Sequence, residues 1–278
     1  MFNLEMLLYL LGFLLILLVL LLFLGKTTKP TMSVSAFKGR AFAHRGLHTG
    51  KEISENSNHA FLHAIEKGYG IELDIQHTKD NQLVVFHDKN LQRMCNNSNN
   101  IYELTYAELM EYPLPNGEKI PLFKDVLTLI NGKTPIIIEV KYYDNVILNT
   151  ALALELLKNY SGDYCIKSFH PKCVQYLKNN APQILRGQLA LSTYNKNTNN
   201  ITNFAFKHLL VNFIGRPHFI SYEESGDFPL TVKIIKKCFS PLFALWTIRD
   251  EKTFLEVQNK ADMFIFEGFE PKKPHCNK

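Results

Sequence analysis

The chain has 278 residues, a formal net charge of +5 and a hydrophobic fraction of 46%. Its positive charge is spread out, without a run of five Lys or Arg, so a dedicated nucleic-acid binder is not expected and no nucleic acid is among the expected partners. The cysteines form no C-x-x-C pair, which argues against a structural zinc site and a disulfide framework: Cys95, Cys165, Cys173, Cys238 and Cys276.

The amino-terminal segment is long and apolar enough to cross a bilayer. Residues 6–24 contain no charged side chain, and as a helix they would extend roughly 28 Å, close to the hydrocarbon thickness. A buried core helix would rarely be apolar on every face over this length. A cleaved signal peptide is the other alternative, but the segment before the run holds Glu5 and no Lys or Arg, and no A-x-A-like site follows. We interpret residues 1–25 as an uncleaved transmembrane anchor and residues 26–39 as a linker.

Basic residues follow this segment, and none precedes it: Lys26, Lys29, Lys38 and Arg40. The positive-inside rule therefore predicts a single-pass protein of the cell membrane whose large domain lies on the cytoplasmic side.

From residue 40 onwards, apolar runs alternate with helical patterns. Strands are expected at 41–46, 70–76, 83–87, 135–141, 164–169, 185–191, 218–223, 242–248 and 262–267, and helices at 58–67, 145–159, 171–180, 201–213, 231–238 and 250–261. Repeated strand–helix units predict a parallel sheet covered by helices. Eight units fit a closed (β/α)₈ TIM barrel over residues 40–278, with 83–87 as an extra piece beside the second strand. An open doubly wound sheet is the alternative, but no G-x-G-x-x-G follows the first strand.

Polar residues stand where several of these strands end, which is where active sites form in such a barrel. The first strand ends in His44-Arg45-Gly46. Gly permits a sharp turn, His can exchange a proton near neutral pH, and the planar guanidinium of Arg suits a phosphate. Phe86-His87-Asp88 supplies a second imidazole, so one His can act as a base and the other as an acid.

Three carboxylates are predicted to share one point. Glu72 and Asp74 are two residues apart on one strand and so face the same way. Two buried carboxylates on one face are costly unless a cation lies between them, and oxygen ligands suit Ca²⁺ or Mg²⁺ better than zinc. Glu139 can complete this metal site, and Lys141 can neutralise charge that builds on a phosphate. Each motif alone is more typical of a structural or solvated position, but their joint occurrence at strand ends predicts one phosphate-and-metal site.

These motifs make the sequence resemble the glycerophosphodiester phosphodiesterase family. The matching strings follow one another in order over residues 40–268: AHRG at 43–46, EN at 55–56, ELD at 72–74, HD at 87–88, EVK at 139–141, KSF at 167–169 and WT at 246–247. The resemblance implies a barrel with an extra segment at about 88–134, and one divalent cation held by Glu72, Asp74 and Glu139. It also implies His44 and His87 as the acid/base pair, with Arg45 and Lys141 on the phosphate and Trp246 beside the glycerol.

The sequence departs from the family pattern in two places. Arg249 stands where an Asn is often found, and the last strand ends in Glu267 rather than Asp. The expected reaction is metal-dependent hydrolysis of glycerophosphodiesters to glycerol 3-phosphate and an alcohol. The alternatives are lysophospholipase D-type cleavage of lysolipids and a catalytically inactive, membrane-tethered binding module. The sequence does not fix the oligomeric state.

Overall fold

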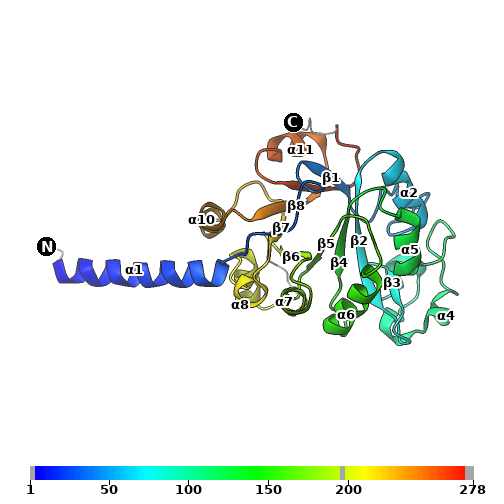
Figure 1. The fold of residues 1–278 in the computed structure, drawn as a ribbon, viewed down its shortest axis with the longest axis horizontal. Coiled ribbons are helices and arrows are strands. Elements are labelled where there is room, and N and C mark those ends of the chain that lie inside the picture. Colours follow the sequence, from blue (N-terminus) through cyan, green and yellow to red (C-terminus); the bar gives the residue numbers. More distant parts are fainter. Residues whose placement is uncertain (1–3, 195–197, 273–278) are drawn as a thin grey trace.

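The computed structural model describes residues 4–194 and 198–272. Eight parallel strands form a closed barrel, because β1 pairs with β9 on one side and with β2 on the other. The eight are β1 (Arg40–Ala43), β2 (Gly70–His77), β4 (Ile136–Val140), β5 (Tyr164–Ser168), β6 (Leu185–Ala190), β7 (Phe219–Glu223), β8 (Leu242–Ile248) and β9 (Met263–Phe266). The predicted (β/α)₈ barrel is confirmed (Figure 1). The short strand β3 (Leu83–Val85) pairs antiparallel with the end of β2, so the extra piece is also where we expected it.

Helices surround the barrel. They are α2 (Asn58–Glu66), α3 (Gln92–Cys95), α4 (Tyr106–Leu109), α5 (Phe123–Ile130), α6 (Val146–Leu157), α7 (Pro171–Asn180), α8 (Asn200–Lys207), α9 (Asn212–Gly215), α10 (Leu230–Phe239) and α11 (Glu251–Val257), with the 3₁₀ turn η1 (Ile101–Glu103). The single helix expected over 201–213 is in fact two, because Leu209 adopts a left-handed φ of 60° that ends the first helix. The helix α5 was not predicted.

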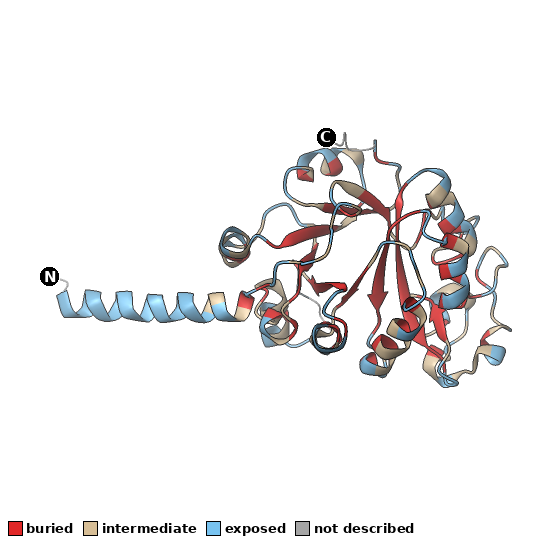
Figure 2. Ribbon diagram, viewed as in Figure 1, coloured by how far each residue is buried: buried red, intermediate tan, exposed pale blue. Residues whose placement is uncertain are grey.

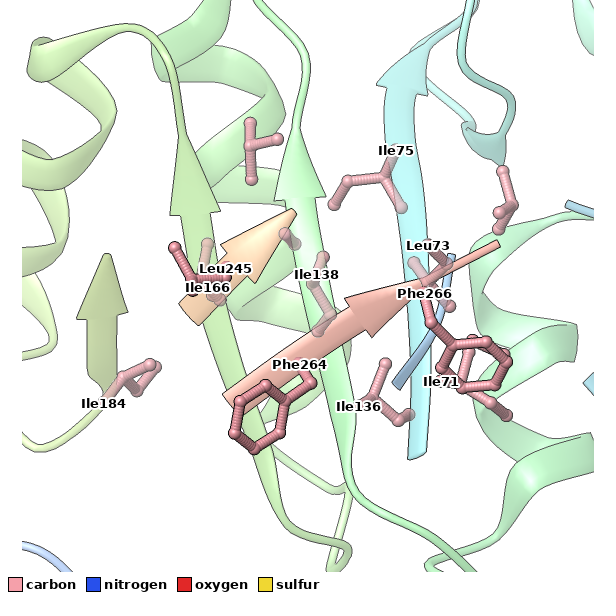
Figure 3. Packing of buried hydrophobic residues seen from close by; sticks show 14 of the residues in the cluster. Ile71, Leu73, Ile75, Ile136, Ile138, Ile166, Ile184, Leu245, Phe264 and Phe266 are labelled. Carbon is pink, nitrogen blue, oxygen red and sulfur yellow. The ribbon is translucent and has the colours of Figure 1, made fainter. Parts of the chain in front are cut away.

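Each barrel strand is buried on both faces, one against the surrounding helices and the other towards the barrel interior. Leu73 and Ile75 of β2 point outward and pack with Ile136 and Ile138 of β4 beneath the helices (Figure 3). Every residue of β2 and β4 is buried, since the opposite faces line the barrel interior (Figure 2). Because side chains alternate along a strand, Glu72 and Asp74 face the barrel interior. Burial of the apolar outer face of β2 against the helices holds them in that orientation.

The segment at 26–39 packs beneath the amino-terminal end of the barrel. The ring of Phe37 is 3% exposed and stacks on Phe42 with 6.1 Å between centroids. The amide of Thr28 donates a hydrogen bond of 2.9 Å to the carbonyl of Pro217, ahead of β7. This segment closes the end of the barrel opposite the carboxyl ends of the strands.

The helix α1 (Leu4–Gly25) extends away from the barrel, as Figure 1 shows. It has 22 residues with a mean hydropathy of 3.2, and by length and composition it could cross a membrane. Its last turn contacts α9 and α10: Asn212 Nδ2 donates to the carbonyl of Gly25 at 3.1 Å, and Arg216 Nη1 donates to that of Phe23 at 2.6 Å.

The residues after β9 cover the last strand from outside. Phe269 packs against Phe254 and Phe266, and Tyr69 donates a hydrogen bond of 2.9 Å to the carbonyl of Pro271. The helix α1 lies elsewhere, with its last turn packed on α9 and α10.

Candidate active site

The turn after β1 brings His44 and Arg45 to the mouth of the barrel. Arg45 and Gly46 have φ values of 55° and 78°, and a Cβ on Gly46 would lie 2.7 Å from that of Ala60. Gly46 is therefore required both for its backbone conformation and for the close approach to α2. The backbone amide of Arg45 donates a hydrogen bond of 3.1 Å to Glu72 Oε2, which ties this turn to β2.

The three carboxylates expected to bind a metal do come together. Asp74 and Glu139 are partners in the register of β2 and β4, and Glu72 lies one pleat below on the same face. Each offers one oxygen, and these oxygens all lie within 4.8 Å of one another at buried positions. A buried cluster of carboxylate oxygens fits a hard divalent cation.

Two lysines neutralise this cluster from within the barrel. Lys141 Nζ lies 2.7 Å from Glu139 Oε1 and 3.2 Å from Asp74 Oδ1. Lys167 Nζ lies 2.9 Å from Glu72 Oε1, without the alignment of a hydrogen bond, and 3.4 Å from Glu139 Oε2. The sequence indicated Lys141 but assigned no role to Lys167. A lysine inside a buried strand was the available signal, since Lys is almost never fully buried unless it is paired.

These contacts set the charges of the cluster. Burial raises the pKa of Asp74, but the charges of Lys141, His87 and Arg45 outweigh burial and hold it well below its usual value. Burial also raises the pKa of Glu139, but the charges of Lys141 and Lys167 lower it by more, so the pKa lies below its usual value. Burial lowers the pKa of Lys141, but the charges of Asp74 and Glu139 raise it by more, so the pKa lies above its usual value. Both carboxylates are therefore ionised at neutral pH, as metal ligands must be.

A second charged network holds Arg45 and His87 at the rim. Arg45 Nη1 donates to Glu55 Oε1 at 2.7 Å, and its Nε lies 3.6 Å from Asp74 Oδ2. Arg93 donates two hydrogen bonds of 2.6 and 2.8 Å to Glu55 and a third of 2.7 Å to Asp88 Oδ2. His87 Nδ1 lies 2.7 Å from Asp88 Oδ1. Glu55, Asp88 and Arg93 thus link the Arg45 guanidinium to the His87 imidazole.

His44 is held from the opposite side of the mouth. Its Nδ1 lies 2.7 Å from Glu267 Oε2, just after β9. The hydrogen bond with His44 lowers the pKa of Glu267 to about 2, so the carboxylate is ionised and the ring nitrogen that faces it is the donor. The role of Glu267 was open from sequence. Its place beside His44 is explained by the pairing of β9 with β1, which only the closed barrel provides.

Trp246 lies apart from the charged groups. Its Nε1 donates a hydrogen bond of 3.0 Å to the carbonyl of Ser221, and its ring meets Phe169 edge-on at 5.7 Å between centroids. Among the described residues, no hydrogen bond or ion pair links Trp246 to the charged cluster. The structure thus links Arg45 and His87 to the acidic cluster through contact or charge, while His44 pairs with Glu267 and Trp246 belongs to an aromatic group.

Comparison with known proteins adds a family to this geometry. The sequence profile of the Glycerophosphoryl diester phosphodiesterase family matches residues 44–265. A glycerophosphodiester phosphodiesterase of Caldanaerobacter subterraneus is 31% identical over 165 residues, which are 55% of this chain and 67% of that protein. Lysophospholipase D GDPD1 of Rattus norvegicus is 36% identical over 46% of this chain, but the match spans only 44% of its own length.

Solved structures show the same fold. The glycerophosphodiester phosphodiesterase of Thermotoga maritima superposes with a TM-score of 0.63 at 25% identity, covering 81% of this chain and 93% of that one. A phosphodiesterase of Oleispira antarctica in complex with the product sn-glycerol-3-phosphate gives a TM-score of 0.67 at 21% identity, with 82% of this chain and 92% of that one covered.

Proposed function

The chain belongs to the glycerophosphoryl diester phosphodiesterase family, and on that premise we propose that it hydrolyses glycerophosphodiesters to glycerol 3-phosphate and an alcohol. The observation that carries the proposal is the cluster of three buried carboxylates, with Arg45 and His87 acting on Asp74 and with His44 next to Arg45 in the turn after β1. In a barrel of this kind the carboxyl ends of the strands, where this turn lies, are where reactions occur.

Glu72, Asp74 and Glu139 would hold one divalent cation, Ca²⁺ or Mg²⁺, which when bound supplies positive charge to the phosphate oxygens. Arg45 and Lys141 orient the diester and stabilise the negative charge that builds on its non-bridging oxygens. The distances of both side chains to Asp74, 3.6 and 3.2 Å, support their action at one point. Trp246 would line the glycerol side of the pocket.

His44 and His87 are proposed to move the protons. One imidazole accepts a proton from the nucleophile, which is water or the neighbouring glycerol hydroxyl, as the new bond to phosphorus forms. The other donates a proton to the leaving oxygen as the phosphorus–alcohol bond breaks. Attack by water gives glycerol 3-phosphate directly, whereas attack by the hydroxyl gives a cyclic phosphate that water must then open to glycerol 3-phosphate. Glu267 and Asp88 each bind an Nδ1 atom, which supports the view that both Nε2 atoms face the substrate.

The helix α1 is proposed to be an uncleaved membrane anchor with the barrel on the cytoplasmic side. The length and hydropathy of α1, and the exposure of all but its last residues, support a membrane span. The hydrogen bonds from Asn212 and Arg216 to its last turn support a helix that stays attached to the barrel. A membrane-impermeant thiol reagent tests the side, since Cys238 is exposed. Labelling of Cys238 only after permeabilisation is expected, and labelling in intact cells would contradict this orientation.

The activity is tested with the full-length protein in detergent micelles. Glycerophosphocholine and glycerophosphoglycerol should be hydrolysed in the presence of Ca²⁺ or Mg²⁺, with glycerol 3-phosphate released. Phosphate monoesters should not be hydrolysed. A protein that cleaves no diester with either ion would instead support the inactive binding module.

A lysophospholipase D-type activity is the second candidate. The observation in its favour is an apolar pocket that opens beside Phe169, next to the proposed glycerol position.

A further inference from the structure

Acidic and basic residues are unevenly distributed over the barrel. The sequence has no Asp or Glu between Asp163 and Glu223, or between Asp227 and Asp250. These two stretches contain α8, α9 and α10. On these helices and beside them stand five basic residues, one of which, Lys233, forms an exposed pair with Asp227: Lys207, Arg216, Lys233, Lys236 and Lys237. The three helices and the residues around them therefore carry net positive charge.

The same helices lie where α1 leaves the barrel. Figure 1 shows α8 and α10 on the side from which α1 projects, and α9 and α10 contact α1 directly. Residues 4–20 of α1 are exposed, whereas Leu21 packs against the core and Gly25 is buried. At about 1.5 Å per residue, the exposed part would be about 26 Å long, and the hydrocarbon core of a bilayer is about 30 Å thick. If α1 spans the bilayer, the bilayer surface therefore meets the barrel at α9 and α10.

The junction between α1 and the barrel is tightly packed. A Cβ on Gly25 would lie 2.2 Å from Ile235 Cδ1, so the backbone of α1 is in close contact with α10. The Arg216 guanidinium lies 5.0 Å from the centroid of the Phe23 ring and donates a hydrogen bond to the Phe23 carbonyl. The residues that follow, 26–39, pack beneath the barrel. The face beside α1 is therefore held towards the bilayer and does not swing on a free linker.

Apolar side chains are exposed on this face. Ile201 of α8 is 82% exposed and Leu230 of α10 is 73% exposed, and Phe204 of α8 is exposed as well. Contacts join α8 to α10, because the ring of Phe204 lies 4.2 Å from that of His208, and His208 Nδ1 lies 2.6 Å from Thr231 Oγ1. Exposed apolar side chains among basic residues are typical of a surface that binds an anionic membrane.

We propose that the face formed by α8, α9 and α10 binds the surface of the bilayer that α1 spans, with its apolar side chains at the acyl boundary and its lysines on anionic head groups. This inference rests on the proposed membrane anchor and is independent of the reaction. Each Lys or Arg near an anionic leaflet strengthens binding about fivefold, within a Debye length of about 8 Å. An acidic protein would also match the charge, but the length of α1 places the bilayer against this face.

The test uses full-length protein in vesicles of phosphatidylcholine and phosphatidylglycerol whose acyl chains are brominated, since bromine quenches tryptophan only at close range. Tryptophan is introduced at Ile201 or Leu230, and at Leu62 of α2 as the matched control. Leu62 is 41% exposed, and α2 lies on the side of the barrel away from α1 (Figure 1). Wild-type protein, whose one tryptophan is Trp246, gives the background. Ile201→Trp and Leu230→Trp should be quenched well beyond this background and Leu62→Trp should not. Quenching at Ile201 and Leu230 no greater than at Leu62 would overturn the proposal.

The preference for anionic lipid is tested in Leu230→Trp, by comparing brominated phosphatidylglycerol with brominated phosphatidylcholine at equal mole fraction. The brominated phosphatidylglycerol should quench by about twofold more, because the lysines enrich anionic lipid beside the face. Adding Lys207→Glu and Lys237→Glu should abolish this difference. Adding Lys79→Glu and Lys124→Glu is the matched control, since these lysines are exposed beside β3 and on α5, away from α1 (Figure 1). Equal quenching by the two lipids without the lysine substitutions, or an equal loss in both double substitutions, would contradict the role of the lysines.

A tryptophan in the middle of α1 separates this inference from the proposed anchor. Phe13→Trp should be quenched by lipid brominated near the chain ends, at the bilayer centre, if α1 spans the membrane. Quenching of Phe13→Trp without quenching of Ile201→Trp and Leu230→Trp would show that the anchor stands and that the face does not bind lipid. Absence of quenching in all three would show that α1 does not insert and would overturn both proposals.

Discussion

Lys167 and Glu72 form an ion pair inside the barrel, with 2.9 Å between Nζ and Oε1 and both side chains at most 2% exposed. The ammonium lies against the carboxylates that would bind a metal, and with Lys141 it gives the acidic cluster an internal counter-charge. This arrangement offsets part of the cost of burying three carboxylates together before an ion is bound.

Replacing Lys167 with Met should destabilise the chelator-treated protein by about 3–5 kcal/mol, because breaking a buried pair leaves uncompensated charge. Adding Ca²⁺ or Mg²⁺ should recover more stability in the variant than in the wild type. Denaturant unfolding with and without the ion measures both effects.

Lys158→Met is the matched control, since its pair with Glu155 has both side chains about two-thirds exposed, at 66% and 68%, and such pairs contribute about 0–1 kcal/mol. If Lys167→Met unfolded at the same denaturant concentration as the wild type in chelator, Lys167 would not be the counter-charge we infer.

Replacing Glu267 with Ala should change the pH dependence of both stability and turnover. The pKa of Glu267 is lowered from 4.5 to about 2 by its bond with His44, so the pair stabilises the fold above pH 4.5 and loses this contribution as the pH falls towards 2. The free energy of unfolding of the variant should therefore decrease less than that of the wild type as the pH falls from 4.5 towards 2. Its kcat should fall by about tenfold or more, with a shifted pH–rate profile, because His44 loses the partner that orients it. An unchanged pH–rate profile would make Glu267 a structural residue only.

Replacing either His44 or His87 with Ala should lower kcat for glycerophosphocholine by about 10²-fold or more if each moves a proton in the reaction. His59→Ala is the control, because its side chain is 71% exposed on α2. The steady-state rate of glycerol 3-phosphate release measures all three. A variant of His44 or His87 that retains wild-type turnover would remove that residue from the mechanism.

The barrel and its acidic cluster could be predicted because both follow from local pattern. The alternation in Ile71-Glu72-Leu73-Asp74-Ile75 fixes which side chains face inward, and the strand–helix repeat fixes the sheet order. The break at Leu209 and the helix α5 were missed. A single left-handed residue gives no signal in hydrophobic periodicity, and α5 lies within the segment that we treated as an insertion after the second strand.

The contacts between distant strands could not be predicted in the same way. The pair of Glu267 with His44 needs β9 beside β1, and that of Lys167 with Glu72 spans the interior from β5 to β2. The burial of Phe37 beneath the barrel was missed for a related reason, since a polar segment such as 26–39 gives no sign of packing.

The central claim is that Glu72, Asp74 and Glu139 hold a divalent ion that diester hydrolysis requires. The most direct measurement is glycerophosphocholine turnover as Ca²⁺ or Mg²⁺ is titrated into the chelator-treated full-length protein and its Asp74→Asn variant. We predict that the wild type regains turnover to a saturating level and that the variant does not. Full wild-type turnover in chelator, or recovery of Asp74→Asn at the same ion concentration, would contradict the account.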